Sequence, residues 1–481
     1  MTAALAFGGK DIPPDELERR AACAASGFEA MGVREGDVVA LFLHNGPAYL
    51  EAMLACRLLG AYHCPINWHF KADEAGFILR DSGARALVAE PELLAQIGGA
   101  PVPVVNNWKE WRDRHAPWRG APRAPRTNMP YTSGTTGRPK GVRRMPATEK
   151  QRALALDLYR TVLGLEPGMR ALISAPLYHS APNLYAMQAL LHGSLLVVEP
   201  RFDAERTLAL IEQHRLTNVY LVPTMFVRLL RLPPETRKRY DISSLRFISS
   251  TGSPCPPDVK RAMIDWVGPL ITETYAASEL GHVTFIGSRE WLERPGSVGR
   301  PLGEGVLKIL DDAGRELPPG EIGLIYCRQP AYPDFTYTNN PAARAALERD
   351  GLWCVGDMGY LDAAGYLYVA DRKSDMVISG GVNIYPAEIE AVLMTMPGIA
   401  DCAVFGIPDA EFGEALAAAV QLRPEQRGSA AEVQQFLRER IAGYKVPRVV
   451  TFHDALPRED SGKIFKRLLR APYWAEAGRR I

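Results

Sequence analysis

The sequence DVVALFL at residues 37–43, followed after three residues by PAYLEAMLACRLL at residues 47–59, decides the fold class of this chain. The first stretch is a short apolar run, which predicts a buried strand. The second begins with proline and continues with mostly apolar, helix-favouring residues, which predicts a helix. A strand that leads directly into a helix is the building unit of parallel sheets covered by helices.

The same alternation continues along the chain and extends this prediction. A helix is expected over residues 204–214, with Asp203 as its N-cap. Further apolar strands are predicted at residues 171–175, 195–198, 218–222, 245–249 and 269–271. The fold class is therefore α/β, with helices on both faces of its sheets. Ligands in such folds bind in loops at the carboxyl ends of the strands.

The sequence pattern changes after Val298, where short strands and Gly/Pro turns predict a β-barrel-like part of a large composite N-terminal domain. A charged run at residues 371–375 then precedes a small α+β unit with predicted helices at 387–396 and 430–441 and strands at 403–407 and 417–422. We therefore predict an N-terminal domain at residues 1–371, a hinge at 372–375 and a small mobile C-terminal domain at 376–481.

Composition excludes several classes of function. The chain has 481 residues with 56 Lys plus Arg and 55 Asp plus Glu, a formal net charge of +1. That balance lacks the basic excess of a general nucleic-acid binder. The 7 cysteines form no C-x-x-C pair, which argues against zinc and dithiol sites. With no signal peptide in the first twenty residues and only a short, interrupted apolar stretch at 184–198, we expect a cytoplasmic protein with no membrane span.

The loop YTSGTTGRPKG at residues 131–141 carries the strongest chemical signal. Its glycines let backbone N–H groups face an anion, while its hydroxyls, Arg138 and Lys140 suit phosphate oxygens. It cannot be aligned with the Walker A pattern of P-loop proteins, which argues against a P-loop kinase or ATPase. From its residues alone, phosphate binding and an ordinary surface loop remain equally good interpretations.

Further short motifs follow the loop in a fixed order. They are PLYHSAPN at 176–183, TGSP at 251–254, YAASE at 275–279, GLWCVGD at 351–357, DR at 371–372, SGGVNIYP at 379–386 and PREDSGK at 457–463. Each of them alone would be an ordinary turn or surface segment. Together with the loop they resemble the adenylate-forming superfamily of acyl-CoA synthetases, peptide-synthetase adenylation domains and firefly-type luciferases.

The resemblance implies ATP, Mg²⁺ and coenzyme A as cofactors and assigns residues to each. Glu279 would hold the metal, Lys463 would be the principal catalytic residue, and Thr135 and His179 would assist it. The residues expected to contact ATP are Thr132, Ser133, Thr135, Thr136, Lys140, Gly252, Ser253, Pro254, Tyr275, Ser278, Asp357 and Arg372. Gly380 and Gly381 would line the channel for the pantetheine arm of CoA, and Ser374 would be the hinge residue.

The resemblance also outlines an acyl pocket. Its expected lining is His179, Ser180, Asn183, Val222, Met225, Thr251, Gly252, Ala276 and Ala277. Ser180 stands where amino-acid-activating relatives have an Asp that pairs with the α-amino group. Ala276 replaces the usual Gly and adds a methyl group, and Ser278 replaces Thr. We therefore expect a fatty, alicyclic or aryl acid without an α-ammonium group, although a structural role for His179 stays open.

The implied reaction has two steps: the acid displaces pyrophosphate from ATP, and the CoA thiol then displaces AMP from the acyl-adenylate. Two alternatives remain open. The acceptor could be the thiol of a carrier protein, or the chain could be a non-catalytic relative that only binds nucleotide or acyl ligands. The expected partners are thus small molecules, namely the carboxylic acid, ATP and CoA, and the expected assembly is a monomer or homodimer.

Overall fold

The computed structural model describes residues 2–121, 123–132, 139–253, 255–380, 382–458 and 464–476. The chain folds into two compact units: a larger one of residues 1–307 and 327–353, and a smaller one of residues 308–326 and 354–481. The boundaries between these two units differ from the domain limits at residues 371 and 375 that the sequence predicts. Those domain limits stay predictions. The large α/β part and the smaller α+β part nevertheless agree with the predicted fold class.

The larger unit is built on a long sheet whose central strands are parallel. In spatial order the strands are β17 (Arg300–Pro301), β16 (Thr284–Gly287), β13 (Ile271–Glu273), β12 (Phe247–Ser250), β11 (Asn218–Leu221), β9 (Arg170–Ile173), β10 (Leu195–Val198), β1 (Ala4–Phe7) and β2 (Lys10–Ile12). Antiparallel partners occur at the two edges, at β2, β16 and β17. The strands predicted between residues 171 and 271 all belong to this sheet, with ends shifted by a few residues.

A second, wholly parallel sheet has the order β4 (Tyr62–Pro65), β3 (Val38–Phe42), β5 (Ala86–Ala89) and β6 (Val104–Val105). Strand β3 and helix α2 (Pro47–Leu59) confirm the strand and helix predicted at 37–59. Every residue of β3 is buried, as its unbroken apolar run requires. Helix α2 begins with Pro47 and ends at Gly60, whose left-handed backbone at φ 63° stops it.

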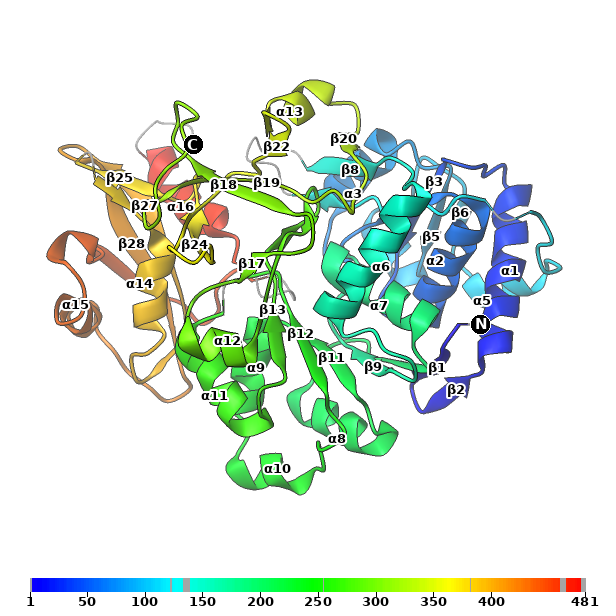
Figure 1. Ribbon diagram of the computed structural model, residues 1–481, viewed down its shortest axis with the longest axis horizontal. Coiled ribbons are helices and arrows are strands. Elements are labelled where there is room, and N and C mark those ends of the chain that lie inside the picture. The colour runs from blue at the N-terminus through cyan, green and yellow to red at the C-terminus, as the bar shows by residue number, and fades with distance from the viewer. Residues whose placement is uncertain are drawn as a thin grey trace. The chain divides into compact units, whose positions relative to one another are not determined.

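Helices cover these sheets (Figure 1). Helix α1 (Pro14–Ala30) packs on α2, and helices α6 (Glu149–Leu163) and α7 (Ser180–His192) pack on the long sheet. Helix α8 (Ala204–His214) has the predicted bounds, and the Asp203 side chain accepts a hydrogen bond from the Arg206 amide as its cap. The remaining helices of the larger unit are α3 (Ala72–Asp81), α4 (Pro91–Gln96), α5 (Trp108–Asp113), α9 (Pro223–Leu230), α10 (Pro234–Arg239), α11 (Pro257–Val267), α12 (Ser288–Glu293) and α13 (Pro341–Ala345).

Short antiparallel elements complete the larger unit. A small sheet has the order β20 (Phe335–Tyr337), β8 (Lys140–Arg144) and β7 (Tyr131–Thr132). Strands β14 (Ala276–Ala277) and β15 (Gly281–His282) form a tight hairpin directly after β13. Strands β21 (Glu348–Arg349) and β22 (Leu352–Trp353) form another antiparallel pair. The small sheet carries Thr132 and Lys140, and the β14–β15 hairpin carries the motif residues Ala276 to Glu279.

The smaller unit contains the antiparallel pair β23 (Asp357–Leu361) and β24 (Leu367–Arg372), followed by a second sheet of mixed direction. That sheet consists of β25 (Val377–Ser379), β26 (Val382–Ile384), β27 (Ile399–Asp409), β28 (Gly413–Leu422) and β29 (Val449–Phe452). Its helices are α14 (Pro386–Leu393), α15 (Ala430–Arg438) and α16 (Lys466–Glu476). The two strands and two helices predicted between 387 and 441 are confirmed, although both strands are longer than expected. Strands β18 (Val306–Leu310) and β19 (Gly323–Arg328) contribute residues to both units.

A transmembrane helix needs about 20 consecutive, mostly apolar residues. None of the helices in the described segments combines the length and the apolar content that a bilayer crossing requires.

Candidate active site

Glu279 lies in the turn of the β14–β15 hairpin, where its side chain is buried with 6% of its surface exposed. Its Oε1 accepts hydrogen bonds from Thr132 Oγ1 at 3.3 Å and from the Tyr337 hydroxyl at 2.8 Å. Within the described residues, no basic side chain lies within ion-pair distance of this carboxylate. Carboxylate oxygens are ligands of the kind that Mg²⁺ binds, and this carboxylate has no internal cation among the described residues to compete with a metal.

Thr132 and Lys140 flank the glycine-rich loop and pair with each other at the ends of β7 and β8. The Lys140 ammonium lies 5.2 Å from the centre of the Tyr337 ring, the ring whose hydroxyl binds Glu279. Three expected phosphate ligands, Ser133, Thr135 and Thr136, lie outside the described residues. Thr132 therefore contacts the predicted metal ligand Glu279 directly, and Lys140 contacts Tyr337, the tyrosine that binds Glu279.

The residues expected around adenine follow two adjacent parallel strands. Thr251 comes directly after β12, and its Oγ1 donates a hydrogen bond to the Thr274 carbonyl, 3.0 Å away, beyond the end of β13. Gly252 has φ 99°, a left-handed conformation that favours glycine, while Ser253 is half-buried and Pro254 lies outside the described residues. The Tyr275 amide donates to Thr284 Oγ1 at 3.1 Å and holds the buried tyrosine at the base of the hairpin.

The motif at residues 176–183, which is expected to line the acyl pocket, contacts the β14–β15 hairpin through two serine hydroxyl groups. His179 is the N-cap residue of α7, with its ring 4.4 Å from the Tyr178 ring. Ser180 Oγ lies 2.7 Å from Ser278 Oγ, so the two serines share a hydrogen bond. This contact joins the start of α7 to the residue that precedes Glu279.

Asn183 is buried in α7, and both ends of its amide are occupied. Its Nδ2 donates to the Leu177 carbonyl at 2.9 Å, and its Oδ1 lies 2.9 Å from His63 Nε2. Burial lowers the pKa of His63 to about 4, so this imidazole is neutral at pH 7 and can donate to the amide oxygen. The observed contacts of Asn183 hold the segment before His179 in place, and its predicted contact with substrate remains a prediction.

The other predicted pocket residues lie on separate elements. Val222 and Met225 are buried at the start of α9, immediately after β11. Ala276 and Ala277 are half-buried in β14.

In the smaller unit, Asp357 and Arg372 face each other across the β23–β24 pair, with Arg372 Nε 3.2 Å from Asp357 Oδ1. Ser374 is exposed two residues later, and its carbonyl accepts a hydrogen bond from Arg470 Nη1 at 3.2 Å. Gly380 has φ 58° and leaves no room for a Cβ atom, which would lie 2.9 Å from the Phe412 ring. Gly381 and Lys463 lie outside the described residues.

Two side chains at the site were not expected from the sequence. Tyr337 binds Glu279, and Arg144 donates to the Ser278 carbonyl beside it. For Tyr337 the only signal was an aromatic residue in a short polar strand. For Arg144 the signal was stronger, because side chains alternate along a strand and Arg144 shares the buried face of β8 with Val142.

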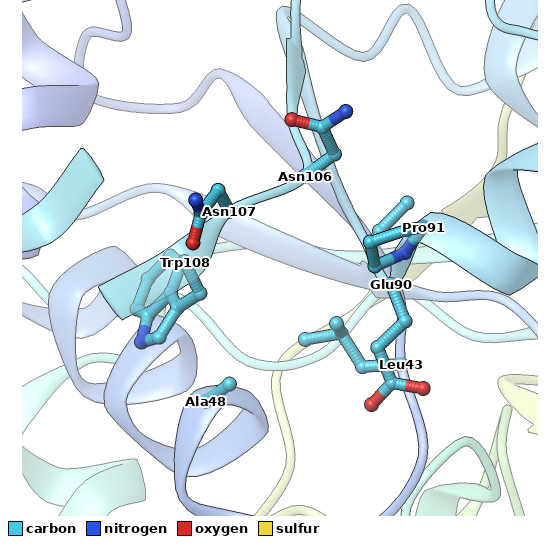
Figure 2. A pocket seen from close by; sticks show the side chains of 8 residues that line it. Leu43, Ala48, Glu90, Pro91, Asn106, Asn107 and Trp108 are labelled. Carbon is cyan, nitrogen blue, oxygen red and sulfur yellow. The ribbon is translucent and has the colours of Figure 1, made fainter. Parts of the chain in front are cut away.

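A separate cavity of about 570 Å³ lies at the carboxyl ends of β3, β5 and β6 (Figure 2). Its lining residues are Leu43, Ala48, Ala89, Glu90, Pro91, Asn106, Asn107 and Trp108. The Glu90 carboxylate in this wall is already bonded to His44 Nδ1. None of the predicted site residues lines this cavity, so it is distinct from the Glu279 site.

Comparison with known proteins agrees with these motifs. The family of AMP-binding enzymes matches residues 2–332, and the AMP-binding enzyme C-terminal domain matches residues 388–463. A feruloyl-CoA synthase from Amycolatopsis sp. is 36% identical over 97% of this chain and 95% of its own length, and a fatty acid–[acyl-carrier-protein] ligase from Streptomyces coeruleorubidus is 31% identical over 100% and 95%.

Solved structures agree as well. The o-succinylbenzoate CoA synthetase from Bacillus subtilis, in complex with its acyl-adenylate intermediate, is 30% identical with a TM-score of 0.84 and covers 97% of this chain and 95% of its own. Its likeness extends over both units of the fold. The chain therefore belongs to the AMP-binding enzymes of the adenylate-forming superfamily.

Proposed function

We propose that this protein is an AMP-forming acyl-CoA synthetase. The observation that carries the proposal is the buried Glu279 carboxylate, which contacts Thr132 of the glycine-rich loop and has hydroxyl partners in place of a basic one. An acid can react with a thiol only after its oxygen has been made a leaving group. Adenylation achieves this with ATP, and the AMP-binding family membership supports it.

In the first step, a carboxylate oxygen of the acid attacks the α-phosphorus of ATP while the bond from that phosphorus to the pyrophosphate oxygen breaks. In the second, the CoA sulfur attacks the acyl carbon, loses its proton and expels AMP. The first step gathers negative charge, so fixed cations and hydrogen-bond donors should dominate its catalysis. Lys140, Thr132 and the loop between them would hold the phosphates, and Lys463 would stabilise the charge that develops between acid and α-phosphate.

Mg²⁺ is the metal that the Glu279 environment suits, because the carboxylate supplies a charged oxygen ligand. When bound, the metal would neutralise charge on the phosphate oxygens. Thr132 and Tyr337 orient the Glu279 carboxylate through their hydrogen bonds. In the smaller unit, Asp357 would accept hydrogen bonds from the ribose hydroxyls and Arg372 would assist it.

The acid would carry an uncharged aryl, alicyclic or fatty tail. Ser180 shares its hydroxyl with Ser278 and offers no carboxylate to an α-ammonium group. Val222, Met225 and Ala276 would supply an apolar wall of limited depth. Similarity to a feruloyl-CoA synthase supports an aryl acid within this set.

A panel of acids tests the proposal. Each acid is incubated with ATP, Mg²⁺ and CoA, and pyrophosphate, AMP and acyl-CoA are measured separately. We expect at least one aryl or fatty acid to give all three, and Lys463→Ala to lower pyrophosphate release by orders of magnitude. Formation of ADP and phosphate, or an α-amino acid that outperforms every other acid, would contradict the proposal.

A second acceptor is favoured by one observation, the similarity to a fatty acid–[acyl-carrier-protein] ligase. In that case acyl-AMP would form normally and the thiol of a carrier protein would replace CoA. Comparing CoA with phosphopantetheinylated carrier proteins at equal concentration decides between the two. A chain that binds ATP but releases no pyrophosphate with any acid would instead be a binding protein.

The expected hinge at Ser374 gives a separate test of the two steps. Proline at this position would restrict φ to about −65° and disfavour the α region for Lys373. Ser374→Pro should therefore impair one half-reaction more than the other in a folded protein. Unchanged rates of both acyl-AMP formation and transfer to CoA would place the pivot at another residue.

A further inference from the structure

Arg144 is a buried cation whose guanidinium is bound by carbonyl groups. Only 8% of its surface is exposed. Its Nη2 donates to the Ser278 carbonyl at 2.9 Å, and its Nη1 donates to the Pro333 carbonyl at 3.1 Å. No carboxylate of the described residues lies within ion-pair distance of it. Burying a guanidinium without a carboxylate partner is unfavourable, so such a residue is expected to serve more than packing.

The carbonyl that Arg144 binds belongs to the turn that presents Glu279. Ser278 precedes Glu279 directly, so a shift of this carbonyl would move the carboxylate with it. The guanidinium also lies 5.3 Å from the centre of the Tyr332 ring. That ring packs under Gly281 on the other side of the turn, where an added Cβ would lie 2.3 Å away and φ is 72°. Arg144 and Tyr332 therefore hold the hairpin before and after Glu279.

The strand that carries Arg144 also organises the partners of Glu279. In the pairing of β8 with β20, Arg144 lies opposite Phe335 and Val142 opposite Tyr337. Strand β8 also begins with Lys140, which pairs with Thr132. The Arg144 carbonyl accepts a hydrogen bond from the Tyr62 hydroxyl at 2.6 Å, which fixes the end of β8. One small sheet thus supplies the two hydroxyls on Glu279 and the guanidinium on its turn.

We propose that Arg144 is the positioning residue that sets the Glu279 carboxylate against the phosphate-binding strands. It acts by docking the Ser278 carbonyl onto β8, and its fork-shaped guanidinium is needed because two carbonyls on different segments must be bound at once. The proposal rests on the proposed function, in that Glu279 is taken as the ligand of the metal that accompanies ATP.

Two variants and one control test the proposal. Arg144→Met removes both hydrogen bonds, whereas Arg144→Lys keeps the charge without the fork geometry. The control is Arg143→Met, on the same strand, because Arg143 binds the Gly36 carbonyl at 2.7 Å and lies 4.8 Å from the Tyr62 ring, away from the hairpin. All three proteins are first compared with wild type by circular dichroism and melting temperature.

The first readout is the Mg²⁺ concentration that gives half-maximal pyrophosphate release at saturating acid. We expect it to rise about tenfold or more in Arg144→Met and about threefold in Arg144→Lys, a larger change than in the KM of the acid. The second readout needs no turnover: it is the increase in melting temperature caused by ATP with Mg²⁺ compared with ATP and EDTA. The part of the melting-temperature increase that requires Mg²⁺ should fall to less than about half of its wild-type value in both Arg144 variants. It should stay unchanged in Arg143→Met.

The possible results distinguish a failure of the positioning role of Arg144 from a failure of the proposed reaction. A folded Arg144→Lys or Arg144→Met protein whose Mg²⁺ dependence and Mg²⁺-dependent melting shift both equal those of wild type overturns the role of Arg144. If Arg144→Met does not fold, Arg144→Lys decides by the same two readouts. A wild-type protein that shows the Mg²⁺-dependent melting shift but releases no pyrophosphate with any acid would refute the proposed reaction while leaving the positioning role to be judged by melting alone.

Discussion

Glu273 and Glu279 are equally buried, each with 6% of its surface exposed, and lie six residues apart, yet they are stabilised in opposite ways. Glu273, in β13, forms an ion pair with Lys260, whose Nζ lies 2.6 Å from the Glu273 carboxylate. Lys260 is itself fully buried on α11, with its ammonium 4.7 Å from the centre of the Trp291 ring. Glu279, in the following hairpin, is held by the hydroxyls of Thr132 and Tyr337.

The difference shows that burial alone does not distinguish a carboxylate that has an internal cation from one that does not. A carboxylate with an internal cation is already charge-balanced, so its partner must stay in place for the fold to remain stable. A carboxylate whose partners are neutral donors has no internal cation to displace when a cation arrives with a ligand. The two carboxylates therefore differ in their partners and not in residue type or depth, and the metal role proposed for Glu279 rests on that difference.

The strongest test of this contrast is Lys260→Met, which leaves Glu273 buried without its cation. We expect the free energy of unfolding to fall by about 3–5 kcal/mol, the usual loss when one partner of a buried ion pair is removed. The Mg²⁺ dependence of pyrophosphate release should not change. Urea unfolding measures the loss, with the exposed Lys238→Met as the matched control. A loss below about 1 kcal/mol would mean that Glu273 tolerates burial without its cation.

Glu279→Gln should give the opposite result. We expect pyrophosphate release to fall by about 100-fold, because an amide has no charge for the metal. Stability should change by less than about 1 kcal/mol, since both hydroxyls can still donate to the amide oxygen. Glu235→Gln, at an exposed position, is the control. If Glu279→Gln released pyrophosphate at the wild-type rate at low Mg²⁺, Glu279 would not be a ligand of the metal.

A buried base extends the comparison from acids to histidine. Burial lowers the pKa of His63 to about 4, below its ordinary value near 6.5, so this imidazole destabilises the fold as pH falls from about 6.5 towards 4. At pH 5 the expected loss relative to pH 8 is about 2 kcal/mol. His63→Gln, which can still donate to Asn183, should remove that part of the pH dependence in unfolding measurements. An unchanged pH dependence would mean that His63 does not titrate in this way.

The smallest effect is expected for the double variant Lys260→Met with Glu273→Leu. Replacing both charges of a buried ion pair by apolar groups of similar volume is nearly neutral, so stability should return to within about 1 kcal/mol of wild type. A double-mutant cycle measures the coupling between the two side chains. If the double variant stays as unstable as Lys260→Met alone, the lysine stabilises the fold through packing on Trp291 and not through its charge.

Local sequence patterns were sufficient for much of the fold. The apolar run before Pro47, the helix that Gly60 ends and the Asp203 cap of α8 depend on interactions within a few residues, so the sequence determined them. The observed ends of the strands differ from the predicted ends because hydrogen bonding to a neighbouring strand, and not local composition, decides where a strand ends. Strand β27 (Ile399–Asp409), expected as 403–407, is long because β28 pairs with it along its whole length.

For the site, the sequence by itself determined which residue types stand in which order, and the ordered motifs were enough to indicate adenylation chemistry. It could not show that Glu273 has a cation and Glu279 has hydroxyls, because Lys260, Thr132 and Tyr337 come from distant segments. It also could not show that Arg144 reaches the Ser278 carbonyl, 134 positions away along the chain. Only tertiary structure decided these pairings, since the charge that a buried group retains depends on the atoms packed around it and not on its neighbours in sequence.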